Sequence, residues 1–165
     1  MRICSLVPGA TEVVAALGLE DHLIGISHEC DFPPSLARVP VMVRPRVESG
    51  SLSSAQIDAQ VGTVLSNGEG LYELDEPRLL AAKPELLIVQ DLCDVCAITP
   101  MQLAGILREL SPPPRMLTLN PRRLDDILRD IATLAAALER EEAGNQLAAR
   151  LRDRLDAVRK TVSVE

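Results

Sequence analysis

The chain has 165 residues, of which 47% are hydrophobic, and its formal net charge is −7. This length suits one domain with its own core, and the apolar fraction is typical of globular proteins. The acidic balance argues against nucleic acids and anionic membrane surfaces as partners, because phosphate groups are bound by basic faces. The only aromatic side chains are Phe32 and Tyr72, so the core must consist of Leu, Val, Ile and Ala.

The first residues, MRICSLVP, contain one charge and a very short apolar run. A secretory signal needs a longer apolar region, and a membrane span needs about 18 apolar residues in a row. We therefore expect a cytoplasmic product without membrane insertion. In that compartment cysteines serve as thiols or metal ligands more often than as disulfides. The four cysteines are Cys4, Cys30, Cys93 and Cys96.

Strand-like and helix-like segments alternate through the first 120 residues, which predicts an α/β domain with a mostly parallel sheet. The expected elements, in chain order, are a strand at 3–7, a helix from a Thr11 cap to Gly18, a strand at 23–27, an extended piece at 39–43, a helix from Ser53 or Ser54, a helix at 76–82, a strand at 85–90, a helix at 100–110 and a strand at 116–119. The strand at 85–90 holds the run LLIV, which is typical of a strand covered on both faces.

From Leu124 onward the pattern is helical, with a break expected near residues 139–142. This divides the chain into an α/β ligand-binding lobe at residues 1–138 and a long helix at 139–165. The second helix carries an apolar stripe at Leu147, Leu151, Leu155 and Val158. If that stripe is exposed, the chain is expected to form a homo-oligomer.

Three segments together resemble the substrate-binding proteins of ABC importers for cobalamin and ferric siderophores, in particular the cobalamin-binding proteins. They are SLVPGATE at 5–12, GISHECDFPP at 25–34 and LLAAKPELLI at 79–88. The resemblance implies a three-layer, Rossmann-like lobe with a long C-terminal helix, which is the amino-terminal lobe of a class III periplasmic-binding protein. It also implies a second lobe, which a separately encoded chain would supply, and a periplasmic or cell-envelope location as the alternative.

The family resemblance further implies an ABC permease as partner, and Glu76 lies near the position where related importers carry a glutamate that docks on the permease. The alternative is that Glu76 only stabilises its helix, because a carboxylate near a helix N-terminus interacts favourably with the helix dipole. The ligand that the resemblance implies is cobalamin, another corrinoid or a metal chelate, held between two lobes.

The parallel topology itself predicts where a ligand binds, because ligands of open parallel sheets lie outside the carboxyl ends of the strands. The loops after the first, second and buried strands should meet at that edge, with Tyr72 on its rim. The candidate ligand-binding residues are Pro8, Gly9, Ala10, Thr11, His28, Glu29, Cys30, Asp31, Phe32, Tyr72, Asp91 and Cys93.

Several roles are open for these residues. The first loop offers backbone N–H groups at a helix start to polar groups of a ligand. Phe32 either packs on the flat face of a macrocycle or fixes its own loop to the core. His28 could approach the cobalt of a corrinoid. Arg44 and Arg46 either meet an anionic group of the ligand or lie in a solvated loop.

A metal site is the other option at this edge. Cys93 and Cys96 form a Cys-x-x-Cys motif, and with His28 and Cys30 they would make a four-ligand site suited to zinc. The same cysteines could form a disulfide or be plain structural residues. Cys4 is expected in the core.

The leading hypothesis is therefore a solute-binding lobe for cobalamin or a related metal chelate, linked to ABC-type import and requiring no cofactor. The alternatives are a cytoplasmic metal- or redox-responsive protein built on the Cys/His cluster, and a truncated lobe without activity. No nucleotide-binding or catalytic motif occurs, so we do not expect an enzyme.

Overall fold

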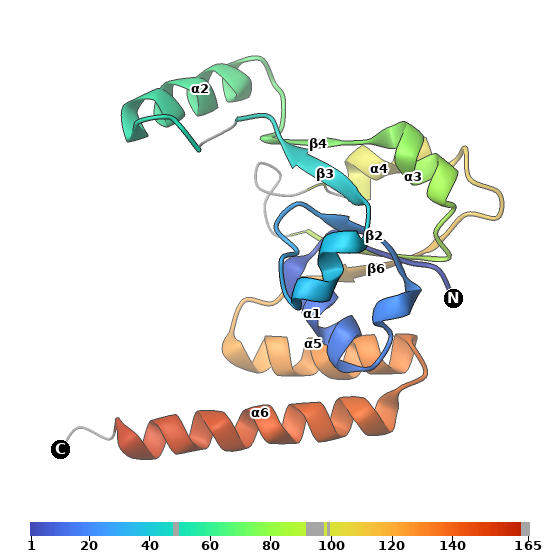
Figure 1. The fold of residues 1–165 in the computed structure, drawn as a ribbon, viewed down its shortest axis with the longest axis vertical. Coiled ribbons are helices and arrows are strands. Elements are labelled where there is room, and N and C mark those ends of the chain that lie inside the picture. The colour runs from blue at the N-terminus through green and yellow to red at the C-terminus, as the bar shows by residue number, and fades with distance from the viewer. Residues whose placement is uncertain (48–49, 92–97, 99, 163–165) are drawn as a thin grey trace.

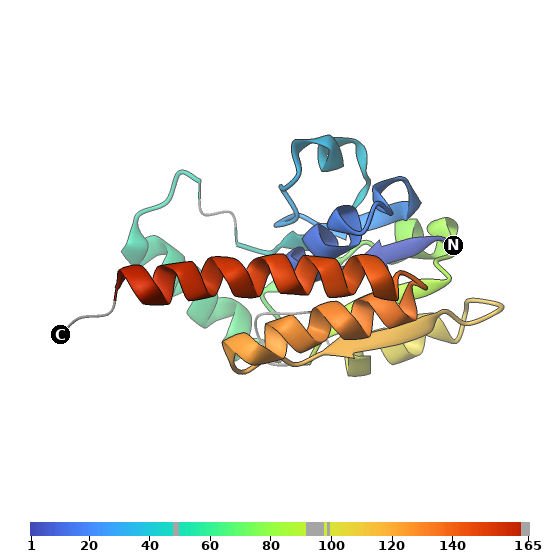
Figure 2. The same cartoon turned by 90° about the horizontal axis from the view of Figure 1, so that it is seen from below.

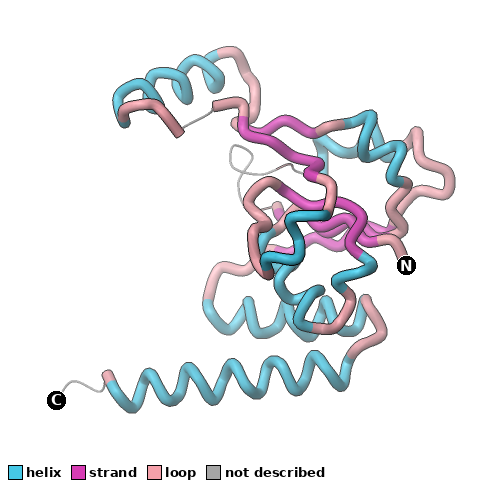
Figure 3. Tube along the Cα trace, viewed as in Figure 1, coloured by secondary structure: helices cyan, strands magenta, loops and turns pink. Residues whose placement is uncertain are grey.

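A computed structural model of the chain describes residues 1–47, 50–91, 98 and 100–162. Its centre is a six-stranded sheet in the order β4-β3-β2-β1-β5-β6 (Figures 1 and 3). The strands are β1 (Ile3–Ser5), β2 (Leu23–Ser27), β3 (Val41–Pro45), β4 (Tyr72–Leu74), β5 (Leu86–Gln90) and β6 (Arg115–Leu119). All neighbouring strands run parallel except β3 and β4. The predicted mixed α/β fold with a mostly parallel sheet is confirmed.

The helices are α1 (Pro8–Ala16), α2 (Ser54–Ser66), α3 (Glu76–Ala82), α4 (Pro100–Leu107), α5 (Leu124–Ala137) and α6 (Glu141–Thr161), with two 3-10 turns, η1 (Glu20–His22) and η2 (Pro34–Arg38). Helices α1 and α5 share a core with one face of the sheet, and α3 and α4 share a core with the other. In β5, Leu86 and Ile88 join the first core while Leu87 and Val89 join the second. The continuous apolar run of this strand thus reflects burial on both faces.

Helix α2 stands away from the rest of the fold (Figures 1 and 3), and none of its residues is buried. It is nonetheless well capped, because Ser53 and Gln56 form a reciprocal capping box. Among the described helices, none combines the length and the hydrophobicity that crossing a bilayer requires.

One local prediction was wrong at the start of the chain, and one strand further along was missed. Helix α1 begins at Pro8, so Thr11 lies inside the helix and does not cap it. Proline suits the first helical position because it lacks the N–H that would be unpaired there. Strand β4 was not predicted: it has three residues and exists through its antiparallel pairing with β3.

The predicted break before the last helix is confirmed, with Glu139 in a left-handed conformation at φ 57°. Figure 2 shows α6 lying along α5 as an outer layer. The apolar stripe of α6 is mostly covered, because Leu147, Leu151 and Leu155 pack against a cluster on α5. Only its far end remains open, where Val158 is 59% exposed. The stripe that was expected to drive self-association is thus largely used within the chain.

The buried thiol of Cys4 predicts a loss of stability at alkaline pH. Burial raises the pKa of this thiol far above its ordinary value of 9.0, with a smaller contribution from Cys30. The folded protein therefore keeps a proton that the unfolded chain releases above about pH 9, so the free energy of unfolding falls as pH rises further. We expect urea titrations to show a slope of about 1.4 kcal/mol per pH unit from this group. The Cys4→Ala variant should lose that slope, and an unchanged slope would contradict the assignment.

Lys83 ends α3 in a left-handed conformation at φ 46°, directly before Pro84. Side chains other than glycine are strained there by about 1 kcal/mol. We expect Lys83→Gly to raise the midpoint of urea unfolding, while Lys83→Ala, which removes the same charge but keeps a Cβ, should not. Equal midpoints for the two variants would show that backbone strain at this residue is negligible.

Candidate functional site

A cavity of about 180 Å³ lies at the carboxyl edge of the sheet. It is lined by Leu6, Pro8, Ser27, His28, Glu29, Val43, Tyr72, Gln90 and Ile98. Because β1, β2, β3 and β5 run parallel, their last residues and the loops after them meet at this edge. The antiparallel strand β4 begins here, which adds Tyr72. The predicted meeting of Pro8 and His28 is therefore found, with Tyr72 beside them, whereas Cys93, the third residue expected there, lies outside the described residues.

His28 is held firmly by the strand beside it. The carbonyl oxygen of Val43 accepts the backbone N–H of His28 at 3.1 Å, and ring Nδ1 lies 3.0 Å from the same oxygen. A carbonyl can only accept a hydrogen bond, so Nδ1 carries the proton and Nε2 of the neutral ring offers a lone pair. An imidazole fixed in this way is the usual form of a histidine that binds a metal.

The group next to Nε2 is the carboxylate of Glu29, with Oε1 at 3.1 Å. The Glu29 side chain is 65% exposed, whereas that of His28 is 19% exposed. A protonated ring would donate from Nε2 to Glu29. With a neutral ring, the exposed carboxylate can turn toward solvent and leave Nε2 open to the cavity.

Tyr72 covers the other side of the imidazole. The two ring centroids are 5.3 Å apart and the planes are inclined by 40°. Beside Tyr72, the guanidinium of Arg46 pairs with Glu73 at 3.5 Å. Neither Arg46 nor Arg44, which is exposed on β3, is among the described residues that line the cavity.

Three of the predicted residues are buried and do not line the cavity: Ala10, Thr11 and Cys30. Thr11 Oγ1 lies 2.8 Å from Ser5 Oγ, 3.0 Å from Val7 O and 3.1 Å from Cys30 Sγ, which makes a closed polar cluster beneath the edge. The reason is the early start of α1, which turns Thr11 toward β1. Gly9 and Ala10 border a separate cavity of about 160 Å³ between α1 and α5.

The remaining predicted residues of these loops lie outside the cavity lining. Phe32 is 60% exposed, so it does not fix its loop to the core, while a role at a flat ligand face stays open to it. Asp31 and Asp91 are also exposed, and the backbone N–H of Asp91 donates to Asn120 Oδ1 at 2.9 Å. Glu76 is exposed in the first turn of α3, a position that suits both roles proposed for it.

The described residues give little support to the predicted zinc site. Burial raises the pKa of the Cys30 thiol, although the hydrogen bond between this thiol and Thr11 acts the other way, and a protonated thiol is a poor metal ligand. Within the described ranges, no group of three or more His, Cys, Asp or Glu side chains could hold a metal ion. Cys93 and Cys96 lie outside the described residues.

Five lining residues were missed from the sequence: Leu6, Ser27, Val43, Gln90 and Ile98. They share no chemistry, but Ser27 and Gln90 are the last residues of their strands and Leu6 follows β1 directly. These lining residues could therefore have been predicted from their position at the end of a parallel strand, whatever their residue type.

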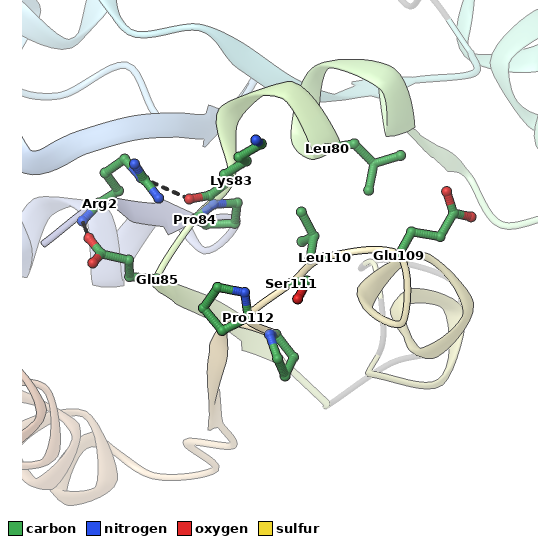
Figure 4. A pocket seen from close by; sticks show the side chains of 10 residues that line it. Arg2, Leu80, Lys83, Pro84, Glu85, Glu109, Leu110, Ser111 and Pro112 are labelled. Carbon is green, nitrogen blue, oxygen red and sulfur yellow. Dashed lines mark hydrogen bonds between the residues drawn. The ribbon is translucent and has the colours of Figure 1, made fainter.

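A second, larger cavity of about 570 Å³ lies at the opposite, amino-terminal edge of the sheet (Figure 4). Its walls carry both signs of charge, with Arg2 and Lys83 on one side and Glu109 on another (Figure 4). The guanidinium of Arg2 is partly occupied, because its Nε donates to the carbonyl of Lys83 at 2.8 Å. This groove has no aromatic side chain and no histidine, so it offers little to a metal chelate.

The profile of the periplasmic binding protein family matches residues 3–165. Among solved structures, the chain is similar to the periplasmic heme-binding protein RhuT from Roseiflexus sp. RS-1, with 24% identity and a TM-score of 0.69 over 97% of this chain and 49% of that one. It is also similar to the periplasmic vitamin B12 binding protein BtuF of Vibrio cholerae, with 24% identity and a TM-score of 0.66 over 97% of this chain and 50% of that one.

A periplasmic heme binding protein from Pseudomonas aeruginosa is similar as well, with 20% identity and a TM-score of 0.67 over 94% of this chain and 44% of that one. No curated protein matches the chain. The chain thus spans about half the length of the solved structures to which it is similar. These likenesses confirm the predicted fold, a lobe of a class III periplasmic-binding protein.

Proposed function

The chain belongs to the periplasmic binding protein family, and we propose that it is a solute-binding lobe that captures cobalamin, a related corrinoid or another metal chelate for an ABC-type importer. The family consists of binding proteins, not enzymes, which agrees with the expectation from the sequence. Its members are periplasmic, and no finding supports the cytoplasmic location that we expected.

The observation that carries the proposal is the placement of His28. Its ring is anchored through Nδ1 on the carbonyl of Val43, and it lines a cavity at the edge where parallel sheets bind ligands, with Nε2 lying 3.1 Å from the exposed carboxylate of Glu29. An imidazole fixed through Nδ1 suits the axial position of a metal held in a macrocycle, once the carboxylate of Glu29 has turned away from Nε2. The described residues contain no cluster of side chains that could hold a metal ion by itself, so in this proposal the metal arrives already bound in the flat ligand.

The surroundings of His28 also suit a flat, largely apolar ligand. Tyr72 and Ile98 line the cavity, and the exposed ring of Phe32 stands on the same loop as His28. Aromatic faces bury large areas against planar ligands and orient them. Heme and vitamin B12, which are named as ligands of the structural neighbours, are metal-containing macrocycles, and we therefore choose compounds of this class as test ligands.

The proposal is tested by spectral titration of the protein with aquocobalamin, diaquacobinamide and hemin. Replacement of a metal-bound water by imidazole nitrogen changes the visible spectrum, so we expect saturable difference spectra with at least one corrinoid. Free imidazole at the same concentration is the reference for unspecific ligation. Spectra identical to those of the probes without protein, for all three compounds, would contradict the proposed function.

A further inference from the structure

The groove at the amino-terminal edge of the sheet has no part in the capture of a metal chelate. Its volume of about 570 Å³ falls within the roughly 300–1,000 Å³ of pockets that hold small molecules. Three segments that are far apart in the sequence form its walls, namely Arg2, residues 80–85 and residues 109–113. The groove is therefore large enough for a ligand of its own.

The walls of the groove are fixed by the backbone. The carbonyl oxygen of Arg2 accepts the backbone N–H of Glu85 at 2.8 Å, and a carboxylate oxygen of Glu85 accepts the backbone N–H of Arg2 at 2.5 Å. Prolines restrict the backbone on two of the three segments, at Pro84, Pro112 and Pro113. A ligand thus meets a groove that is already formed, which lowers the entropic cost of binding.

Two positive groups on one wall are available to a ligand. The guanidinium of Arg2 uses its Nε, which donates to the carbonyl oxygen of Lys83 at 2.8 Å. Among the described residues, neither the terminal nitrogens of Arg2 nor the ammonium group of Lys83 has a hydrogen bond or an ion pair. Guanidinium and ammonium groups form strong, charge-assisted hydrogen bonds with carboxylates. This wall therefore suits the anionic end of a ligand.

The groove also offers a negative group and an apolar surface. The exposed carboxylate of Glu109 has no hydrogen bond or ion pair within the part of the chain that the structure describes. Figure 4 shows the side chains of Leu80 and Leu110 between Lys83 and Glu109. The hydroxyl of Ser111 adds a group that can donate or accept a hydrogen bond. The groove thus presents positive, apolar and negative surfaces in turn.

We propose that this groove binds a short apolar peptide with free ends. Its C-terminal carboxylate lies at Arg2 and Lys83, its N-terminal ammonium group lies at Glu109, and an apolar side chain packs on Leu80 and Leu110. A single amino acid carries both charges on one carbon and cannot place them on separate walls. The site lies at the opposite edge from the chelate site, so it stands or falls independently of the proposed function.

The test is an NMR titration of the ¹⁵N-labelled 165-residue chain with the tripeptide alanyl-leucyl-alanine. We expect saturable shifts of the backbone amides in the three wall segments. The same peptide with a C-terminal amide, and the same peptide with an acetylated N-terminus, should each bind about 5- to 10-fold more weakly, because each lacks one of the two charges. Equal affinities of the three peptides would overturn the proposal, as would the absence of saturable shifts in these segments.

Variants of the groove assign each end of the peptide. In Lys83→Gln the difference between the free peptide and its amide should narrow, and in Glu109→Gln the difference between the free and the acetylated peptide should narrow. The control is Lys160→Gln, which removes an exposed ammonium group from the last turn of α6 and should bind like the parent protein. Differences that stay unchanged in both groove variants would place the peptide elsewhere and overturn the assignment.

Discussion

Replacing His28 by alanine is expected to weaken corrinoid binding by about 100-fold or more and to abolish the spectral change that marks ligation. The estimate is a lower bound, because removal of a group that merely orients a metal ligand already weakens binding by about 10–100-fold. His28 is the imidazole of the described cavity lining, and its Nδ1 is anchored on the carbonyl oxygen of Val43. Its loss would leave contacts through Tyr72 and the apolar lining.

The matched control is His22→Ala, which makes the same change in the only other histidine. His22 lies in η1, before β2 and thus at the opposite edge of the sheet, where Nδ1 lies 2.9 Å from the carbonyl oxygen of Met1. This variant should bind and absorb like the parent protein. Equal affinities of parent and His28→Ala, in the same titration, would refute the role assigned to His28.

The second large effect is expected from Gly144→Ala, which should lower the free energy of unfolding by about 1–3 kcal/mol. Gly144 is buried in the first turns of α6, and a Cβ built on it would overlap the Cβ of Ala135 on α5. Neither a backbone-anchored methyl group nor its helix can move cheaply, so α6 must shift away from α5. Leu147 and Leu151 would then lose part of their contact with that helix.

Gly62→Ala provides the comparison, because Gly62 also lies within a helix, α2, but has open space around its Cβ position. There the better helix propensity of alanine should raise the free energy of unfolding by about 0.5–1 kcal/mol. Urea unfolding of the two variants should thus give shifts of opposite sign. A gain in stability for Gly144→Ala would show that α6 does not lie as closely on α5 as described.

The main elements of the fold could be predicted because their signals are local. The run at 86–89 is apolar on both faces, which required helices above and below the sheet, and both layers are present. Helix α2 was predicted from its starting serines and its apolar spacing, and Ser53 accepts a hydrogen bond from its first turn. The short helix α3 was predicted at the right residues, although its cap, Asp75, was not recognised in the sequence. The break before α6 was likewise visible in the charged residues that interrupt the apolar pattern.

The parts of the site that could not be predicted depend on contacts between distant residues. The direction of the Thr11 and Cys30 side chains is set by a polar cluster with Ser5, and residue type alone does not distinguish a buried threonine or thiol from an exposed one. Val43 contributes through its carbonyl oxygen, which no side-chain pattern marks. Topology placed Pro8 and His28 together, but only the register of β3 with β2 shows what anchors the imidazole.

The central claim is that the ligand lies at the carboxyl edge of the sheet, and hydrogen–deuterium exchange with and without a bound corrinoid tests it most directly. We predict that the ligand slows exchange in the segments around Pro8, His28 and Tyr72, and leaves the groove around Arg2, Lys83 and Ser111 at the other edge unchanged. Slower exchange around Arg2 and Lys83, with no change around His28, would contradict this account.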